Sequence, residues 1–193
     1  MKPLAREELF SLEHYAQQRA DFRARVMAHK KARTVYLGEH LTLIFEDRLT
    51  VQYQVQVMLR IERIFEAAGI QDELDAYNPL IPGGADLKAT LMLEFADVAE
   101  RKRELMRLRG IEHGIELRVQ GCPPVVGIAD EDLPRSNEEK TSAVHFLRFP
   151  LSAAHIAAWR AGAAVSLASS LPALCVEGLL SGEQRCALAA DFA

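Results

Sequence analysis

The stretch EDRLTVQYQVQVMLRIERIFEAAGIQDELDAYNPLIP, residues 46–82, decides the fold of the first part of the chain, because it supports two secondary structures. Its apolar residues alternate with other residues from Leu49 to Ile61, which is the period of a β-strand. Asp47, in contrast, is a residue type that caps helices, and Gly69 can end one. The segment MLRIERIFEAAG is rich in strong helix formers. The stretch therefore favours either a strand or a helix.

We predict a helix over residues 48–68 and a second, shorter helix over residues 71–77. The β-branched residues favour extended backbone, so a strand over residues 50–57 stays open. Upstream, apolar residues at three- and four-residue steps predict one long helix over residues 5–33. Two short alternating runs on either side of a glycine predict a β-hairpin over residues 34–46.

Strands and helices alternate more clearly in the second part of the chain. We expect strands over 87–95, 115–119, 143–149 and 163–168, an extended piece over 125–129, and helices over 97–109, 152–160 and 181–190. The order βαβ, connection, βαβ is that of ferredoxin-like folds, in which crossover helices join parallel strands. The predicted fold class is therefore α+β, with an N-terminal long helix, hairpin and helices packed on a C-terminal ferredoxin-like βαβ-βαβ sheet.

The chain of 193 residues is long enough for one large domain or two small ones. We divide it into a helical N-terminal region with the β-hairpin, residues 1–82, and an α/β sheet region, residues 83–193. We expect the two regions to form one integrated domain. Almost no apolar residue occurs from 130 to 140, so this segment predicts an exposed loop.

Composition narrows the class of protein. Hydrophobic residues make up 49% and charged residues 26% of the chain, as is typical of a globular protein with its own core. The net charge of −4 gives no global signal for nucleic-acid binding. No apolar run reaches the ~18 residues that a membrane span needs. Acidic residues stand where a signal peptide needs an apolar core, so we expect a cytoplasmic protein that binds neither nucleic acid nor membranes.

Motifs for metals, cofactors and catalysis are absent from the sequence. Cys122, Cys175 and Cys186 lack the spacing of a zinc site or of a disulfide framework. None of the six histidines forms HxH, HxxxH or ExxH, and His145 inside an apolar strand is interpreted as a core histidine. The glycines build no nucleotide loop, and no GxSxG elbow occurs. We therefore predict no metal and no cofactor, and leave open whether the chain is an enzyme.

Amide and guanidinium side chains gather on the opening stretch, where they offer planar paired donors suited to an anion. The alternative is structural: the arginines pair with Asp72 or Glu73 and tie the helix to the loop that follows it. Asn78 then satisfies loose backbone groups before the proline. The candidate ligand-binding residues are Arg48, Gln52, Gln56, Arg60, Glu62, Arg63 and Asn78.

The first helix offers a surface for self-association. Basic residues such as Lys30 and Arg33 crowd its end, and we interpret them as a solvated face, with an anion or acidic partner as the alternative. Long helices often pack against a second copy, so a homodimer is expected through one stripe. That stripe comprises Leu9, Leu12, Ala16, Arg19, Phe22 and Val26.

The segments LTLIFEDRLTVQYQVQVMLRIERI and IQDELDAYNPLIPG resemble a bacterial family of proteins of about this length, known only as a domain of unknown function. The resemblance extends to LRGIEHGIELRV and VHFLRFPL. It implies no mechanism. Some members are encoded near rubrerythrin-like and iron–sulfur oxidoreductase proteins, which implies a link to redox or oxidative-stress physiology. Family members often carry Asp-His-Pro after the last strand, where this chain has SLASSLPAL, residues 166–174.

Two classes of function remain. The first is a non-enzymatic interaction or assembly protein, a homo-oligomer that docks on a redox-protein partner. The missing catalytic motifs, the long first helix and the acidic loop favour it. The second is a small-molecule or anion-binding protein, with or without catalysis, that uses the polar residues of the 46–79 stretch. A well-formed pocket lined by those residues would favour the second class.

Overall fold

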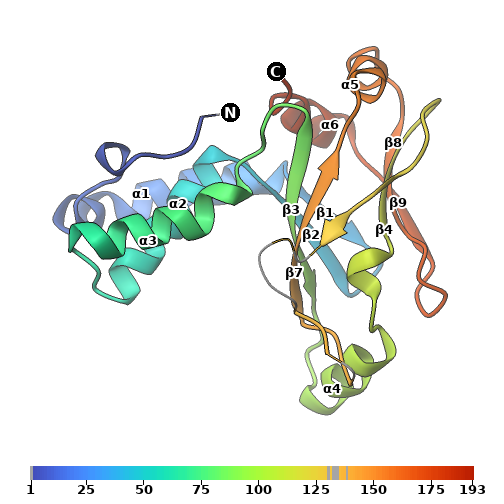
Figure 1. Cartoon of the computed structure of the whole chain (residues 1–193), viewed down its shortest axis with the longest axis horizontal. Helices are drawn as coiled ribbons and strands as arrows, with labels where there is room; N and C mark the ends of the chain where they lie inside the picture. Colours follow the sequence, from blue (N-terminus) through green and yellow to red (C-terminus); the bar gives the residue numbers. More distant parts are fainter. Residues whose placement is uncertain (1, 130, 132–134, 138) are drawn as a thin grey trace.

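The structure, a computed structural model, describes residues 2–129, 131, 135–137 and 139–193. A helical arm projects from a body made of β-sheets and shorter helices, as Figure 1 shows. No helix in this described part of the chain is long and apolar enough to cross a membrane. The exposed loop predicted over 130–140 is described only in part, because positions 130, 132–134 and 138 lie outside the described residues.

The arm is built from α-helices and short 3₁₀ turns. The predicted long helix over 5–33 begins only at Leu12, because the Ser11 hydroxyl accepts a hydrogen bond from the His14 N–H at 3.2 Å and caps the helix there. The elements are, in chain order, η1 (Arg6–Glu8), α1 (Leu12–Lys31), α2 (Arg48–Ile61), α3 (Ala67–Tyr77) and η2 (Asn78–Leu80).

The stretch that favours either a strand or a helix is helical, as predicted. The Asp47 carboxylate accepts the Thr50 N–H at 3.0 Å, and the Thr50 hydroxyl accepts the Asp47 N–H at 2.9 Å. This reciprocal cap fixes the start of α2 and outweighs the strand propensity of the β-branched residues. The helix ends at Ile61 rather than at residue 68, because Arg63 takes a left-handed backbone angle, φ 55°, and turns the chain toward α3.

Within the described residues, the body contains two antiparallel sheets. Sheet A has the strand order β1 (Thr34–Leu37), β2 (Leu41–Glu46), β3 (Asp86–Leu93), β7 (Val144–Pro150) and β6 (Ile128–Ala129). Sheet B has the order β5 (Val125–Val126), β4 (Ile115–Val119), β8 (Val165–Ser169) and β9 (Val176–Leu179). The remaining elements are α4 (Val98–Arg107), η3 (Ile111–His113), α5 (Ala153–Arg160) and α6 (Gly182–Ala189).

The α+β class is confirmed, but the single ferredoxin-like βαβ-βαβ sheet is wrong. Helix α4 leads from β3 in sheet A to β4 in sheet B, and α5 leads from β7 in sheet A to β8 in sheet B. Every strand pairing among the described residues is antiparallel. Alternating apolar residues show that a strand has one buried face, but they do not identify its partner. Both helices therefore connect two sheets instead of crossing over one.

The main core lies between the two sheets. Sheet A turns Phe45, Leu91 and Phe149 inward, all fully buried, toward Leu117 and Leu167 of sheet B. The opposite face of sheet A faces the arm. Ile44 pairs with Thr90, and Thr90 pairs with Phe146, so these three side chains form one row across that face.

The arm has two small cores of its own. Val51, Val55 and Leu59, at four-residue steps on α2, pack with Leu74 of α3 and with Leu4 near the chain start. On the other side of α2, Tyr15, Phe22 and Val26 of α1 pack against Leu49 and Tyr53. Phe22 and Val26 of the predicted dimer stripe are thus buried within the arm, whereas Ala16 and Arg19 are exposed. The homodimer itself stays a prediction.

Candidate functional site

Two predicted site residues, Gln56 and Asn78, bind the backbone of the chain's own N-terminal segment. The Phe10 N–H donates to Gln56 Oε1 at 2.5 Å, and Gln56 Nε2 donates to the Phe10 carbonyl at 3.3 Å. The Leu4 N–H donates to Asn78 Oδ1 at 2.8 Å, and Asn78 Nδ2 donates to the Leu4 carbonyl at 3.0 Å. Each amide therefore uses both a donor and an acceptor on a single residue of the segment.

Arg48 and Gln52 contact the same segment. Gln52 Nε2 donates to the Glu8 carbonyl at 2.8 Å, and Arg48 Nε donates to the Lys2 carbonyl at 3.1 Å. Arg48 also pairs with the Glu8 carboxylate at 2.5 Å, which lowers the pKa of Glu8, together with a stronger effect of the Ala5 backbone hydrogen bond. The backbone of the N-terminal segment thus covers the polar side of α2 over the first turns of the helix.

The other predicted site residues, Arg60, Glu62 and Arg63, are exposed at the far end of α2 and do not converge with the first four. Among the described residues, neither arginine forms an ion pair with Asp72 or Glu73, so the predicted tie to the following loop does not form. Asn78 does satisfy backbone groups, but those of Leu4, far earlier in the sequence. The anion site stays a prediction.

A buried arginine, Arg33, joins the arm to the body. It follows α1 and has a side chain that is only 1% exposed, which corrects its interpretation as part of a solvated face. Its guanidinium donates to the carbonyls of Phe45 at 2.9 Å, Glu46 at 3.2 Å and Ala187 at 3.1 Å. It also pairs with Asp191 beyond α6. One side chain thus connects the end of α1, strand β2 and the C-terminal helix.

The ion pairs around Arg33 extend to the cap of α2. Arg33 Nη1 lies 3.5 Å from Asp47 Oδ2, and His29 Nε2 lies 2.5 Å from the same oxygen. Burial raises the pKa of Asp191, and the hydrogen bond from Arg33 acts against this increase. The Asp191 Oδ1 atom is buried and has no hydrogen-bond partner among the described residues. The joint is therefore a dense cluster of polar side chains between arm and body.

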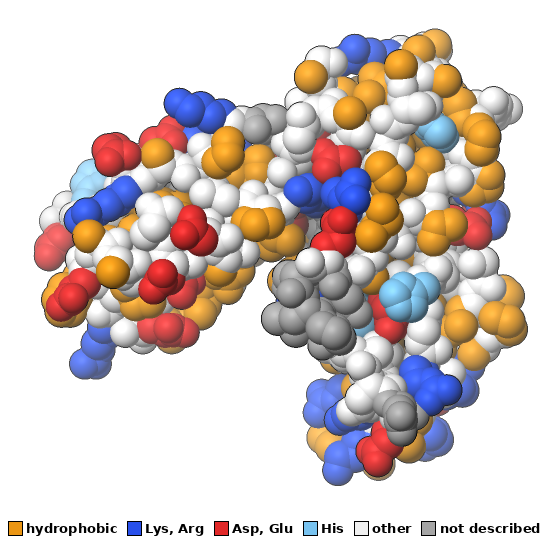
Figure 2. All heavy atoms as spheres, in the orientation of Figure 1, with side chains coloured by type: hydrophobic (Ala, Val, Ile, Leu, Met, Phe, Trp, Pro, Cys, Tyr) orange, Lys and Arg blue, Asp and Glu red, His pale blue; other side chains and the backbone are white. Residues whose placement is uncertain are grey.

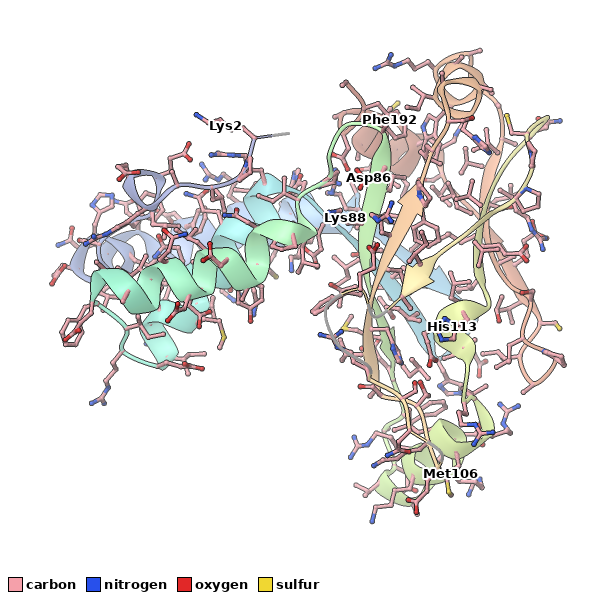
Figure 3. The ribbon with its side chains drawn as sticks, in the orientation of Figure 1. Lys2, Asp86, Lys88, Met106, His113 and Phe192 are labelled. Carbon is pink, nitrogen blue, oxygen red and sulfur yellow. The ribbon has the colours of Figure 1, made fainter. Side chains whose placement is uncertain are left out.

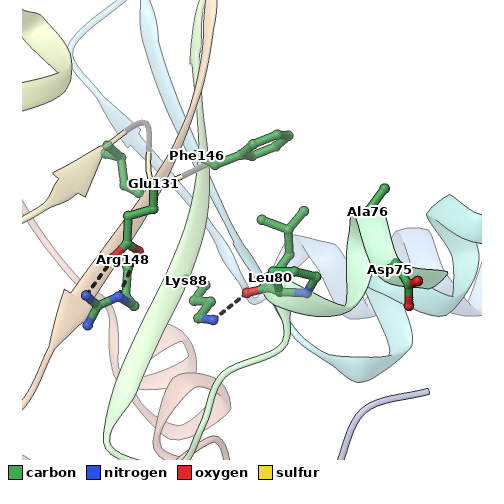
Figure 4. Close-up of a pocket in the computed structure, with 9 residues that line it drawn as sticks. Asp75, Ala76, Leu80, Lys88, Glu131, Phe146 and Arg148 are labelled. Atoms are coloured by element: carbon green, nitrogen blue, oxygen red, sulfur yellow. Dashed lines mark hydrogen bonds and ion pairs between the residues drawn. The ribbon is translucent and has the colours of Figure 1, made fainter. Parts of the chain in front are cut away.

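A groove runs between the arm and the outer face of sheet A, and we call it the arm groove. Its larger cavity, about 440 Å³, is lined by Ala76, Pro79 and Leu80 from the arm and by Lys88, Phe146, Leu147 and Arg148 from the sheet, with Asp75 and Glu131 at its rim. Figure 4 shows these side chains on both sides of the space. Figure 2 shows the recess between arm and body from outside, with acidic and basic side chains gathered at its upper end.

An adjoining cavity of about 270 Å³ continues the arm groove along the sheet. It shares Leu80 and Phe146 with the larger cavity. Its floor consists of side chains from three neighbouring strands, and its walls come from the arm helices. The further lining residues are Lys30, Ile44, Glu46, Val51, Gln54, Tyr77, Thr90, Met92 and Val144.

Charged residues close one end of the arm groove. Arg148 donates two hydrogen bonds to Glu131, from Nε and from Nη2, each 2.8 Å long. These bonds lower the pKa of Glu131 and raise that of Arg148. Lys88 Nζ donates to the Pro79 carbonyl, which bridges sheet and arm (Figure 4). Figure 3 places Lys88 and Asp86 on the side of β3 that faces the arm.

The sequence patterns did not predict the arm groove. Its sheet residues alternate with core residues along β3 and β7, and an outward-facing position is expected to be solvated. The one available signal was the apolar character of outward-facing positions. Met92, Val144 and Phe146 lie on the face opposite to the core, where a solvated strand would carry polar residues.

A second buried polar cluster lies in the body, away from the arm groove. Thr141 Oγ1 donates to Glu112 at 2.9 Å and lies 2.8 Å from Nε2 of His145, which is fully buried as predicted. Ser136 also donates to Glu112. Burial acts to raise the pKa of Glu112, but the hydrogen bonds from Ser136, from its own backbone and from Thr141 outweigh burial and lower that pKa. The cluster fixes the segment before β7 onto η3.

Metal-binding chemistry has no candidate among the described residues, because no three His, Cys, Asp or Glu side chains gather there. The three cysteines are free thiols, two of them exposed.

The fold and the arm groove define a class of protein: an α+β body of two antiparallel sheets, from which a helical arm projects over a largely apolar groove. The chain belongs to the family described as Protein of unknown function (DUF3501), which it matches over residues 3–192. A crystal structure of a protein of unknown function from Burkholderia pseudomallei K96243 is similar to the chain. The two share 48% sequence identity over 100% of each chain, with a TM-score of 0.95. No curated protein matches the chain.

These comparisons confirm the predicted membership in an uncharacterised bacterial family. The similarity of the two structures spans arm and body alike, so the arm belongs to the fold rather than being an addition to it. Neither relative carries an activity that could be transferred to this chain. The link to redox proteins stays a prediction.

Proposed function

We propose that the protein binds a small organic molecule in the arm groove. The observation that carries this proposal is a preformed cavity of about 440 Å³ with a mostly apolar lining and a few charged groups at one end. Ligand sites in proteins are typically concave, roughly 300–1,000 Å³ in volume, and combine an apolar wall with a few polar groups. The site includes Asp75, Ala76 and Pro79 of the 46–79 stretch, but not the anion-binding residues expected there.

The lining indicates the chemical class of the ligand. Leu80 and Phe146 lie between the two cavities, so one elongated apolar body would contact both. Lys88 and Arg148 are matched by Asp86 and Glu131, so the charged end has no excess of one sign. A polar, uncharged end group suits such a site better than a strong anion. An anion would be repelled by the carboxylates that already pair with the two basic residues, and burying its charge would be costly.

The test of this proposal is a substitution at an exposed residue that fills the cavity with a large side chain. Ala76→Trp places an indole in the arm groove from the surface of α3, and Ala68→Trp places the same side chain on the same helix outside it. Binding of an uncharged apolar fluorescent dye, N-phenyl-1-naphthylamine, is measured for both variants and the parent. We expect at least a tenfold loss of dye affinity for Ala76→Trp and none for Ala68→Trp. Equal affinities in all three proteins would overturn the proposal.

Long-chain alcohols and carboxylates of equal length then compete with the dye. The proposal expects the alcohols to compete at least as well as the carboxylates. Phosphate and sulfate are titrated in a thermal-shift assay to test the separate prediction of an anion site with Arg48, Arg60 and Arg63 as donors, because a ligand that prefers the native state raises its apparent stability. The apolar site in the arm groove and the anion site are thus tested by different measurements, and one can be contradicted without the other.

A second candidate function is assembly, as a homodimer or on a redox-protein partner in the cytoplasm. The observation in its favour is the arm tip, where Ile61 is 63% and Phe65 is 70% exposed. Exposed apolar side chains that lie close together are typical of interaction surfaces. Light scattering of the purified protein tests the homodimer, and Ile61→Lys with Phe65→Lys should abolish any dimer formed through the tip. A monomer at all accessible concentrations would contradict self-association.

A further inference from the structure

Residues 2–10, which we call the strap, lie along the arm like a bound peptide. Side chains of α2 and η2 hold the strap backbone: Gln56 and Asn78 bind both groups of Phe10 and Leu4, and Gln52 binds the Glu8 carbonyl. The Gln56 side chain is fully buried under the strap. Such amide-to-backbone bonds recognise the course of a peptide backbone, whatever its side chains are.

Apolar side chains anchor the strap, and Leu4 is the most buried of them. Leu4 is 4% exposed and packs in the arm core among Val51, Val55, Leu74 and Ile81. The neighbouring side chains of residues 2, 3 and 5–8 are exposed, and residues 9 and 10 are half-buried. Leu9 packs against the same core, and Phe10 packs against Phe22 of α1. Apolar anchors combined with backbone recognition are how many peptide-binding sites obtain their affinity.

The strap is joined to the rest of the fold by side chains alone. Its backbone–backbone hydrogen bonds among the described residues, from Glu8 to Ala5 and from Leu9 to Arg6, stay within the strap. Apart from its own 3₁₀ turn η1, it therefore belongs to no sheet and to no helix of the arm. It meets α1 at Ser11, whose extended backbone and own cap make the helix start independent of the strap. The segment can leave its site without unwinding α1.

We propose that the arm carries a peptide-binding site which this chain fills with its own strap, and that the strap of a second copy binds the same site in an exchanged dimer. Exchange of identical elements keeps every contact of the monomer, so it costs little. The second copy is the occupant that the structure favours, because its residues 2–10 match the four polar partners and the Leu4 pocket by construction. This surface differs from the predicted helix stripe and from the arm groove.

The tethered strap competes with any strap from outside. A short tether gives it an effective concentration in the millimolar range, which masks the site in the parent protein. A change that releases the tethered strap without altering its site should therefore expose the site. Leu4→Asp is such a change, because a carboxylate is costly in the apolar pocket. Ala5→Asp is the matched control, with the same charge added one residue away at an exposed position.

The experiment uses the full chain and a fluorescent peptide of residues 2–11, KPLAREELFS, followed by anisotropy. We expect the peptide to bind the Leu4→Asp protein at least tenfold more tightly than the parent or the Ala5→Asp protein. A peptide that itself carries Leu4→Asp should not bind. A folded Leu4→Asp protein that shows no preference for the peptide would overturn the proposal.

A second measurement decides the outcome where Leu4→Asp fails to fold, as judged by circular dichroism. Two batches of the parent protein, labelled with different dyes, are mixed at high concentration, held, and diluted. Exchanged straps give energy transfer that persists after dilution and decays slowly. Its absence, together with a purely monomeric native mass spectrum, would sink the proposal. Ligand binding in the arm groove is tested separately, so neither the presence nor the absence of strap exchange decides it.

Discussion

The arm and the body of this protein are held together in different ways. The body has one continuous apolar core between two sheets, which includes fully buried residues such as Leu43, Leu91 and Leu117. The arm has two small cores, and much of its cohesion comes from polar side chains that bind backbone, such as Gln56 and Asn78. Apolar burial is non-directional, whereas hydrogen bonds fix positions.

The difference indicates where single changes matter most. A large core spreads the loss of one contact over many neighbours, but the placement of the arm depends on a few bonds at the joint. Arg33 alone contacts backbone of β2, backbone of α6 and the Asp191 carboxylate.

Arg33→Met should have the largest effect, because it leaves the Asp191 charge buried without its partner and three carbonyls without a donor. Breaking a buried ion pair from one side costs about 3–5 kcal/mol. The free energy of unfolding, measured by urea titration at neutral pH, should fall by that amount. Arg33→Met combined with Asp191→Leu removes both charges and should recover part of the loss. A double variant no more stable than the single one would contradict this account of the joint.

Leu91→Ala in the body should cost more than Leu74→Ala in the arm. Both leucines are buried, and removal of a buried leucine side chain costs roughly 2–5 kcal/mol, depending on how well the site collapses. The residues around Leu91 are held in place by the sheets, so they cannot fill the space that the smaller side chain leaves. Leu74, in contrast, has half-buried neighbours such as Ile70 and Tyr77, which can move into the space. Urea titrations of the two variants test the order, and equal losses would show that the arm packs as rigidly as the body.

Gln56→Leu should cost about 1–3 kcal/mol, because it leaves the N–H and carbonyl of Phe10 unsatisfied in a part-buried site. The effect should be local to the arm. Amide hydrogen exchange is expected to speed up at the strap and the first turns of α1 and α2, while β3 and β7 keep their protection. Faster exchange in the sheets as well would mean that strap and body unfold as one unit.

Glu112→Gln should have the smallest effect at neutral pH, about 1–2 kcal/mol, since hydrogen bonds to a charged acceptor become neutral ones. Its main signature is in the pH dependence. The folded state lowers the pKa of Glu112 from its ordinary 4.5, so its contribution is present above that pH and lost as the pH falls through the folded-state pKa. The variant should therefore lose less stability than the parent on acidification. Identical acid curves would contradict the assignment.

Asp191 provides the opposite case at the joint. Its pKa is raised by burial, so its contribution is present at low pH and lost as the pH rises through the folded-state pKa. The arm joint and the body cluster should thus respond to acid with opposite signs.

Local sequence signals predicted the elements well. Asp47 and Ser152 marked the starts of α2 and α5, and the strands predicted over 115–119 and 143–149 occur as β4 and β7, within one residue at each end. These elements are set by neighbours in sequence: a cap, a period or a turn. The β-strand at 176–179 was missed, because its four residues, VEGL, are too few for an apolar pattern and include a glycine.

The partners of the elements could not be predicted. Arg33 was interpreted from its position in a basic run, but its acidic partner, Asp191, lies 158 residues away in the sequence. Gln56 was singled out as a candidate ligand-binding residue, and its side-chain amide binds the backbone of Phe10, 46 residues away in the sequence. Spacing along one helix shows which side chains share a face, but not what covers that face. The arm groove was missed for the same reason.

The part of the arm from α2 to η2 is inserted between two neighbouring strands of one sheet, and this has a consequence for protein engineering. Strands β2 and β3 pair from Leu41 with Leu93 to Glu46 with Lys88, although the arm separates them in sequence. The connection between α2 and α3, residues 62–66, is mostly exposed at the far end of the arm. A chain cut there would leave two fragments that still share a sheet and the arm cores. The tip is therefore a natural split point, at which two separately expressed halves should reassemble and report on their own encounter.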